Sequence, residues 1–309
     1  MGNKVSCRKA FTSELLAQAE KNETLYAIAT DSRGSVTIGE FANRYPERFI
    51  ECGIAEQDAV GIAAGLAKTG ANVFVTGPAC FLAARAYEQI KVDVAYNKTN
   101  VKIVGVSAGV SYGPLGCTHT TMHDFASMRA LPSIRVLAPS DDVQTRWLTK
   151  TLIRTQGPCY VRMGRGDVEN VYEEGETFEL GKAKTVCEGN DVTIVACGEM
   201  VAPAKAAAAL LKAQGISARV LDMFTVKPID EQAVLRAAEE TGHIVTVEEH
   251  SVFGGLGEAV AHVVCAQANA KIKMLGLPEE VVIGKSGELF AYYGLTAEGI
   301  CKAAVQLLR

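Results

Sequence analysis

The sequence predicts an α/β protein with two domains, each built on a mostly parallel sheet flanked by helices. Short apolar segments rich in valine and isoleucine alternate with longer segments of helical spacing, which is the pattern of βαβ units. The chain has 309 residues, and 48% of them are hydrophobic. Because a domain commonly has about 150 residues, this length suits two domains that each bury a core.

The expected elements in the first half of the chain include five short strands and two longer helices. The short apolar segments are 24–29, 71–75, 101–106, 133–138 and 159–162. The segments with helical spacing and good helix formers are 56–68 and 83–96. Because strands alternate with helices, we expect a parallel sheet that is covered on both faces.

The alternation stops at residues 164–181, which are rich in glycine and glutamate and poor in aliphatic side chains, as linkers are. It resumes with strands expected at 191–196, 218–222 and 243–248, and with helices expected at 202–214, 229–241 and 255–268. We therefore place the first domain at residues 1–172, a linker at 173–185 and the second domain at 186–309.

Charge and composition argue against several classes of function. A formal net charge of -4 argues against a nucleic-acid-binding protein, which needs a basic patch. No apolar run approaches the roughly 20 residues of a transmembrane helix, and the N-terminal segment lacks the apolar core of a signal peptide. The nine cysteines never form a C-x-x-C pair, which is typical of reduced, buried thiols. We expect a cytoplasmic protein that binds neither nucleic acid nor membrane.

Glu56 and Asp58 form the first candidate site. They begin a glycine- and alanine-rich helical segment that follows a short strand. Side chains at the carboxyl end of a strand face the ligand crevice of an open α/β sheet. Alternatively, both acids only complement the positive N-terminus of the helix, and spacing alone favours this second interpretation.

His119 is the second candidate, because it follows a loop that contains Gly113 and Gly116. Such a loop can hold an imidazole near a substrate, although a single loop histidine is more often structural. His119 and His123 are four residues apart, but Thr120 stands where H-E-x-x-H has its glutamate and no third ligand is evident. We therefore expect no metal site in this chain.

Two cofactor patterns are incomplete. The glycine cluster at 254–257 lacks the last glycine of G-x-G-x-x-G, so it fits tight helix–strand packing better than a dinucleotide site. No Gly-Asp-Gly with a downstream asparagine pair is present. The chain therefore lacks an evident ligand set for the Mg²⁺ that accompanies a diphosphate cofactor.

Several segments, taken in order, resemble the pyrimidine-binding and C-terminal domains of transketolases. They are GIAEQ at 53–57, FLAARAYEQ at 81–89, GCTH at 116–119, DMFTVKPID at 222–230, and VEEH at 247–250 followed by GGLG at 254–257. The resemblance covers nearly the whole chain. It implies a subunit of a transketolase that depends on thiamine diphosphate and moves a two-carbon ketol unit between sugar phosphates.

The resemblance also implies roles for individual residues. Glu56 corresponds to the catalytic glutamate that bonds the pyrimidine ring of thiamine diphosphate, and His119 to a histidine that bonds substrate oxygens and helps proton transfer. Further cofactor contacts correspond to Asp31, Phe81 and Tyr87. The ligands of the sugar phosphate correspond to Arg8, Ser35 and Arg162, and a pair of arginines with a hydroxyl suits a dianion.

Three positions depart from the family pattern. Ser107 replaces a histidine that contacts substrate or phosphate, and Ala84 replaces an aromatic residue beside the pyrimidine. Leu115 replaces an aspartate that reads a substrate hydroxyl. Because a buried polar partner is what rejects a wrong hydroxyl pattern, its loss should relax or redirect selection. We expect an atypical ketose phosphate, for example a branched one.

The resemblance implies a partner as well. Full-length transketolases carry a further N-terminal domain that binds the diphosphate and Mg²⁺. We therefore expect a separate N-terminal subunit that holds Mg²⁺ and shares the thiamine diphosphate. The active sites would lie at subunit interfaces of an α2β2 assembly in which this chain also forms a homodimer.

Other classes compete with this interpretation. The β subunit of a 2-oxo-acid dehydrogenase has the same two-domain layout, and deoxyxylulose-phosphate synthase is a relative that normally carries three domains on one chain. A dinucleotide-binding oxidoreductase is disfavoured by the missing fingerprint. A non-catalytic assembly subunit is disfavoured by the presence of Glu56 and His119.

Overall fold

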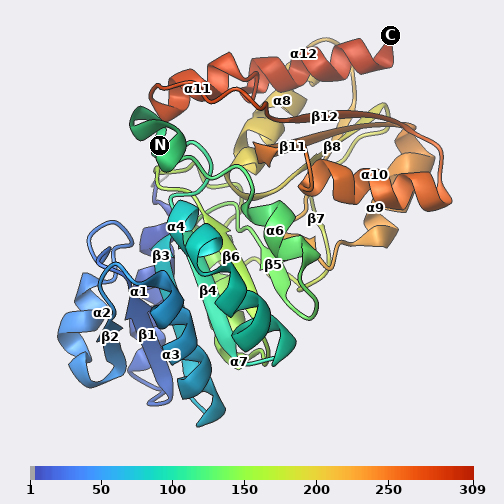
Figure 1. Ribbon diagram of the computed structural model, residues 1–309. Coiled ribbons are helices and arrows are strands. Elements are labelled where there is room, and N and C mark those ends of the chain that lie inside the picture. The colour runs from blue at the N-terminus through green and yellow to red at the C-terminus, as the bar shows by residue number, and fades with distance from the viewer. Residues whose placement is uncertain (1–3) are drawn as a thin grey trace.

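Two β-sheets organise the computed structural model, which describes residues 4–309 (Figure 1). The first domain has a seven-stranded sheet in the order β10-β5-β6-β4-β3-β1-β2. These strands are β1 (Leu25–Ala29), β2 (Phe49–Glu51), β3 (Asn72–Pro78), β4 (Val101–Val106), β5 (Arg135–Leu137), β6 (Cys159–Met163) and β10 (Thr225–Lys227). The second domain has a five-stranded sheet in the order β12-β11-β8-β9-β7. These strands are β7 (Lys184–Cys187), β8 (Val192–Ala196), β9 (Ala218–Asp222), β11 (His243–Ser251) and β12 (Lys271–Leu277).

Most strand pairs in residues 4–309 are parallel, and the antiparallel ladders are β10 with β5 and β7 with β9. The predicted α/β class, with two mostly parallel sheets, is confirmed. All five strands expected in the first half form, with their ends shifted by at most a few residues. Residues 173–183 contain neither strand nor helix, and β7 begins at Lys184, inside the segment expected as a linker.

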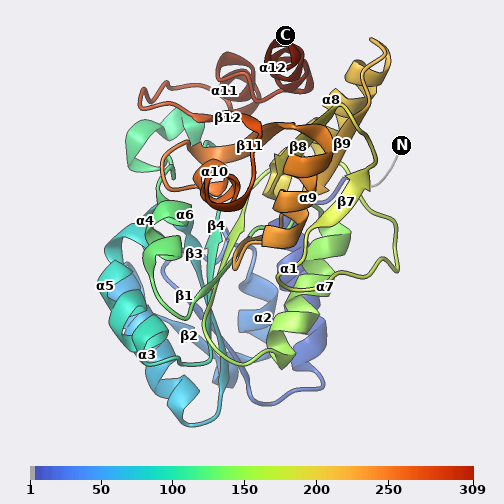
Figure 2. The ribbon, with the colours of Figure 1, turned by 90° about the vertical axis from the view of Figure 1, so that its right-hand side faces the viewer.

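Helices cover both faces of the first sheet (Figure 2). The helices of this domain are α1 (Cys7–Ala19), α2 (Gly39–Arg44), α3 (Glu56–Lys68), α4 (Ala79–Arg85), α5 (Tyr87–Gln89), α6 (Asp124–Ala130) and α7 (Asp142–Arg154). In Figure 2, α1, α2 and α7 lie on one face and α3 to α5 lie on the other. β4 is buried along its whole length, as the apolar sequence of a central parallel strand predicts.

The segment 83–96 is not one helix. It divides into the end of α4, the short α5 and a π-helical segment at Ile90–Tyr96. The break falls at Ala86, whose φ of -95° and ψ of 16° leave the helical region. π-Helical turns occur frequently at functional sites, and this one follows directly on α5.

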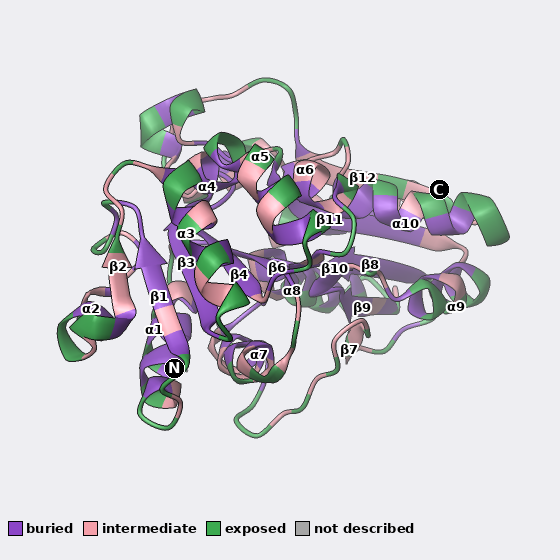
Figure 3. Cartoon of the chain, turned by 60° about the horizontal axis from the view of Figure 1, so that its bottom comes forward, coloured by how far each residue is buried: buried purple, intermediate pink, exposed green. Residues whose placement is uncertain are grey.

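The second domain carries α8 (Val201–Lys212), α9 (Glu231–Thr241), α10 (Leu256–Gln267), α11 (Ser286–Tyr292) and α12 (Ala297–Leu308). Figure 3 shows that the strands of both sheets are largely buried while the outer surfaces of the helices are exposed. No helix in the described part of the chain is both long enough and apolar enough to cross a membrane.

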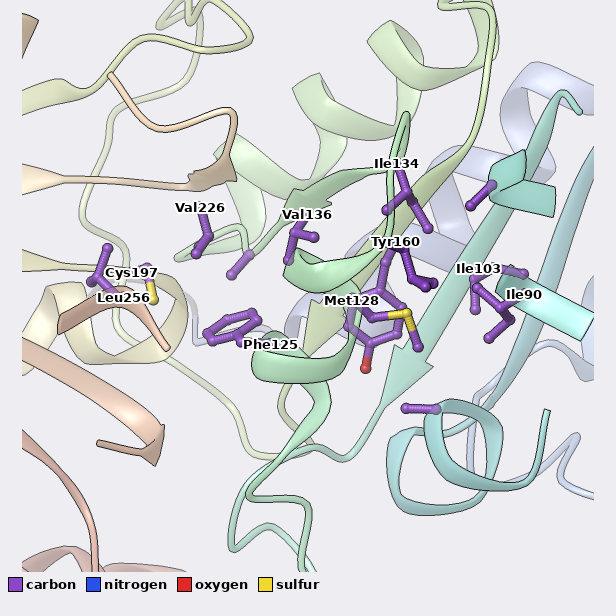
Figure 4. Packing of buried hydrophobic residues seen from close by; sticks show 14 of the residues in the cluster. Ile90, Ile103, Phe125, Met128, Ile134, Val136, Tyr160, Cys197, Val226 and Leu256 are labelled. Atoms are coloured by element: carbon purple, nitrogen blue, oxygen red, sulfur yellow. The ribbon is translucent and has the colours of Figure 1, made fainter. Parts of the chain in front are cut away.

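The two domains share part of their apolar core (Figure 4). Phe125 and Tyr160, from the first half of the chain, belong to the same buried cluster as Cys197, Val226 and Leu256 from the second half. β10 adds a backbone connection, because it comes from the second half of the chain and pairs with β5 of the first sheet. The side chains at the junction are therefore held in fixed relative positions.

Candidate active site

Glu56 is the first residue of α3, and only 3% of it is exposed. The positive end of the helix favours a carboxylate at this position. Arg85 Nη1 donates to both carboxylate oxygens at 3.2 Å. Because a carboxylate offers about four acceptor sites, Glu56 keeps capacity to bond a ligand as well.

Phe81 lies beside this ion pair. Phe81 and Arg85 are four residues apart on α4, and Arg85 Cζ lies 4.1 Å from the centroid of the Phe81 ring. Tyr87, the other aromatic residue expected at the cofactor, donates its hydroxyl to the carbonyl of Ser127 on α6 at 3.2 Å. Ala84 is exposed. Of these residues, Phe81 is thus the one that contacts Arg85, the ion-pair partner of Glu56.

His119 connects Phe81 to Tyr112. Its ring centroid lies 5.0 Å from that of Phe81 and 5.6 Å from that of Tyr112, with edge-to-face geometry in both pairs. The loop 109–119 carries both Tyr112 and His119 and includes a short 3₁₀ segment at Gly113–Thr118. Thr118 Oγ1 lies 2.8 Å from His119 Nδ1, which leaves the other ring nitrogen for a ligand.

Asp31 and Ser35 lie on the loop after β1. Asp31 is exposed, and its backbone N–H donates to Glu51 Oε1 at 2.7 Å. Arg8 on α1 donates from Nη1 to the Ser35 carbonyl at 2.5 Å. The structure therefore brings Arg8 and Ser35 together, while the backbone of Asp31 is hydrogen-bonded to Glu51, the last residue of β2.

Arg162, the other arginine expected at the phosphate, is buried and paired with an acid. Its side chain is 7% exposed and lies within β6, with Nε 2.9 Å from Asp124 Oδ2 and Nη2 2.5 Å from the Glu249 carbonyl. Burial alone would lower the pKa of this guanidinium, but Asp124 and Glu249 outweigh it and raise the pKa above its ordinary value. The Arg162 guanidinium is thus bonded to groups of the protein interior in this structure, and its role as a phosphate ligand stays a prediction.

Arg165 stands beside Arg8 instead. Burial and the positive charge of Arg165 lower the pKa of Arg8, because a like charge nearby disfavours the charged form. Arg165 Nη1 donates to the Tyr112 hydroxyl at 2.7 Å, and its Cζ lies 4.8 Å from the Tyr112 ring centroid. Both arginines line a cavity of about 780 Å³ between the domains, together with Ser111 and Glu199.

These contacts form a continuous series of side chains, which we call the substrate row. In order, its members are Glu56, Arg85, Phe81, His119, Tyr112, Arg165 and Arg8. Arg8 is included because it lines the same cavity as Arg165, whereas the other members are joined by direct contacts. An acid stands at one end and a pair of cations at the other. Three members were not expected from the sequence: Arg85, Tyr112 and Arg165. Three residues that were expected at the site are not members of the row: Asp31, Tyr87 and Arg162.

The three departures from the family pattern lie in different surroundings. Leu115 is 54% exposed on the loop 109–119. Ser107 is buried, has a φ of 59° and has a hydroxyl without a hydrogen-bond partner. Within residues 4–309, no three His, Cys, Asp or Glu side chains gather as a metal site would require.

Two family models match the chain. The transketolase pyrimidine binding domain matches residues 3–170, and the transketolase C-terminal domain matches residues 181–300. Together these two matches cover nearly the whole sequence.

Three known proteins show how far the likeness extends. A subunit of the apulose-4-phosphate transketolase of Phocaeicola vulgatus is 52% identical over 99% of each chain. Transketolase of Homo sapiens is 35% identical, and this chain spans 50% of its length. A solved structure described as a split gene transketolase, an inactive beta4 tetramer, has a TM-score of 0.90 at 39% identity and covers 99% of each chain.

The two-domain fold is that of the pyrimidine-binding and C-terminal domains of a group-transfer enzyme. The chain belongs to the transketolase family, and it is a transketolase-type transferase subunit of the split kind, corresponding to the C-terminal part of a two-subunit enzyme.

Proposed function

We propose that this chain binds the pyrimidine end of thiamine diphosphate and the phosphate end of a ketose phosphate during transfer of a two-carbon ketol unit. The substrate row is the observation that carries the proposal. It joins a buried acid to a pair of arginines through an imidazole, and each of these groups suits one part of the reaction.

The Glu56 end of the row fits an aminopyrimidine. Glu56 is a buried carboxyl with acceptor capacity to spare, and the ring of Phe81 offers an apolar face beside it. Bound thiamine diphosphate supplies nucleophilic addition to the ketose carbonyl and then storage of the electron pair. Glu56 would hold the pyrimidine ring nitrogen, which is the contact that favours the reactive tautomer.

The rest of the row, from His119 to Arg8, would bind the sugar phosphate. His119 would bond the substrate's carbonyl or hydroxyl oxygens and move protons at those atoms. Arg8 and Arg165 would bind the phosphate, because two guanidinium groups can each donate two parallel bonds to its oxygens. Ser35, whose carbonyl holds Arg8, would add a hydroxyl to this site.

A separate subunit would hold Mg²⁺ and the diphosphate. The described residues 4–309 offer no cluster of metal ligands, whereas a diphosphate at neutral pH needs a cation to offset its charge. The thiamine diphosphate would then be shared between the two subunits, with this chain contacting the pyrimidine.

Exposed apolar residues near Glu56 support an assembly. Ile54 is 75% exposed, Ile62 on α3 is 41% exposed, and Val92 and Tyr96 of the π-helical segment are 39% and 76% exposed. Contiguous exposed apolar side chains mark interaction surfaces. We propose that this surface is buried in an α2β2 assembly that contains a homodimer of this chain.

The substrate is proposed to be an atypical ketose phosphate. Leu115, exposed on the loop of His119, offers no polar group to a sugar hydroxyl. The relative at 52% identity carries apulose 4-phosphate in its name, and a substrate of that kind is our first choice. All nine cysteines are free thiols, which supports a location in the reducing cytoplasm.

The test is a reconstitution. The chain would be combined with its diphosphate-binding subunit, thiamine diphosphate and Mg²⁺, and kcat/KM would be measured for apulose 4-phosphate, xylulose 5-phosphate and sedoheptulose 7-phosphate. We expect turnover only in the two-subunit mixture, with the first compound preferred. Turnover by this chain alone would overturn the two-subunit proposal, and preference for the other two compounds would overturn the substrate proposal.

A further inference from the structure

Glu249 of the second domain holds the loop 109–119. This residue lies on β11, and its Oε1 accepts the Val110 N–H at 2.8 Å. Gly109 has a φ of 62°, and a Cβ at that position would lie 2.1 Å from Glu249 Cδ. The carboxyl therefore packs directly against the backbone where the loop begins.

Other parts of the second domain contact the same loop. Ser286 Oγ donates to the Val110 carbonyl at 3.0 Å, so both polar backbone groups of Val110 are bonded across the domain junction. A Cβ on Gly113 would lie 2.3 Å from the Gly284 carbonyl oxygen. The segment that carries Tyr112 and His119 thus packs against the second domain as well as against its own.

Glu249 is itself fixed from the opposite side. Its carbonyl accepts a bond from Arg162 Nη2 at 2.5 Å, and Arg162 is paired with Asp124. Only 4% of Glu249 is exposed, and burial raises the pKa of its carboxyl to about 7. Either protonation form keeps an oxygen that can accept the Val110 N–H.

We infer that Glu249 is a positioning residue for the substrate: it fixes the loop 109–119 so that His119 and Tyr112 stand in the substrate row. The inference rests on the proposed role of His119. By this inference, a residue of the C-terminal domain contributes to substrate binding although it is not a member of the substrate row. Loss of the Glu249 carboxyl would free the start of the loop and let His119 leave its place between Phe81 and Tyr112.

Glu248 provides a matched control. It is also buried, with 0% exposure, and it belongs to the same strand. Its two oxygens accept the N–H groups of Leu256 and Gly257, each at 2.7 Å, so it caps α10 within its own domain. Replacing Glu248 should lower stability without acting on the substrate loop.

The experiment is a double-mutant cycle in the assembled two-subunit enzyme with cofactor and Mg²⁺. Glu249→Leu removes the acceptor, Glu249→Gln keeps an amide oxygen, and both are combined with His119→Ala. We expect Glu249→Leu to lower kcat/KM for the ketose phosphate by about 10- to 100-fold, because it leaves a buried N–H unpaired. Glu249→Gln should stay within about threefold of the wild type, since its amide oxygen still accepts that bond.

The combination with His119→Ala decides the inference. If Glu249 acts through His119, Glu249→Leu should add little to the loss caused by His119→Ala. A full multiplicative loss would overturn the inference while leaving the proposed function intact. Unchanged kcat/KM in His119→Ala alone would instead overturn the proposed role of His119, and the inference with it.

Two further measurements keep the test decisive if Glu249→Leu folds poorly. Ser286→Ala removes the second bond to Val110, and it should give a smaller loss that is coupled to His119 in the same way. Hydrogen–deuterium exchange of residues 109–119 should be faster in Glu249→Leu than in the wild type or in Glu248→Leu. Equal exchange in all three proteins would overturn the inference.

Discussion

The Glu199 carboxyl of the second domain lies against Gly164 of the first, where a Cβ would stand 2.1 Å from Glu199 Oε2. Burial and the charge of Glu249 raise the pKa of Glu199 to about 8, although Arg162, the Gly164 N–H and Arg8 act to lower it. Gly164 immediately precedes Arg165. The position of that arginine therefore depends on contact with the second domain.

Gly164→Ala should weaken binding of the sugar phosphate. The added methyl cannot share space with the Glu199 carboxyl, so either that carboxyl or residue 164 must shift, and a shift of residue 164 carries Arg165 with it. A displacement of about 1 Å can cost about 100-fold, and we expect a rise in KM of about 10- to 100-fold. Steady-state kinetics should show no such rise for an unphosphorylated ketol donor. Gly39→Ala, at a position with nothing within 4 Å, is the matched control.

Arg165→Gln and Arg162→Gln should separate substrate binding from folding. Loss of the Arg165 charge should raise KM for the phosphate substrate by about 10- to 100-fold, since a charge-assisted bond contributes about 1.5–3 kcal/mol. Arg162→Gln leaves Asp124, which is 0% exposed, without its cation, and should cost about 3–5 kcal/mol of unfolding free energy. Chemical denaturation distinguishes the two, and a stable Arg162→Gln with a high KM would contradict our assignment.

Glu56→Gln should abolish most of the turnover while the fold is kept. The amide cannot exchange a proton with the pyrimidine, and general acid–base contacts contribute about 10²- to 10⁴-fold. Single-turnover kinetics of the reconstituted enzyme would measure the loss. Asp58→Asn is the control, because Asp58 is exposed in the same helical turn and should remain close to wild-type activity.

Stability should fall as the pH rises from about 5 to 8. Burial raises the pKa of Glu248 and Glu249 to about 7, above their ordinary 4.5. These carboxyls bind protons more tightly in the folded protein than in the unfolded chain. Their contribution to the free energy of unfolding is therefore complete below pH 4.5 and is lost as the pH rises to 7. Glu199 and Asp222 behave in the same way, with pKa values of about 8 and 7.

His250 acts in the opposite direction. Burial lowers its pKa from 6.5 to about 4. Its contribution to the free energy of unfolding is therefore complete above pH 6.5 and is lost as the pH falls to 4. Because the carboxyls outnumber this histidine, the Tm should decline across the range from about 5 to 8. Glu249→Gln should make the decline shallower, and a wild-type Tm that rises over this range would contradict the prediction.

The central strands could be predicted from the sequence, whereas the edges could not. Val101–Val106 is expected and found at the same residues, because a strand buried on both faces must be continuously apolar. β2 and β10 have three residues each, too few for a periodic pattern, and their pairing depends on neighbours distant in the chain. β12, at the edge of the second sheet, begins Lys-Ile-Lys, and these lysines interrupt the apolar run by which a strand is recognised.

The sequence points to the candidate site only through single residues whose neighbouring segments are recognisable. Glu56 and His119 stand in recognisable segments, and the structure joins them through Phe81. Arg162 and Arg165 are three residues apart, and the sequence alone does not show which of them lies beyond the strand. In the structure β6 ends at Met163, so Arg162 lies within the strand. Arg165 lies past that end, at the edge where ligands bind. The carboxyls that support the row come from another domain, and no spacing could reveal them.

β10 belongs to the second half of the chain, yet it forms the edge of the first sheet by pairing with β5. A fragment cut at residue 172 would leave β5 with unpaired backbone groups, which favours aggregation. Chimeras that exchange only the C-terminal domain between relatives would mix a sheet from one parent with an edge strand from the other. For engineering, the smallest exchangeable part is therefore the pair of domains taken together.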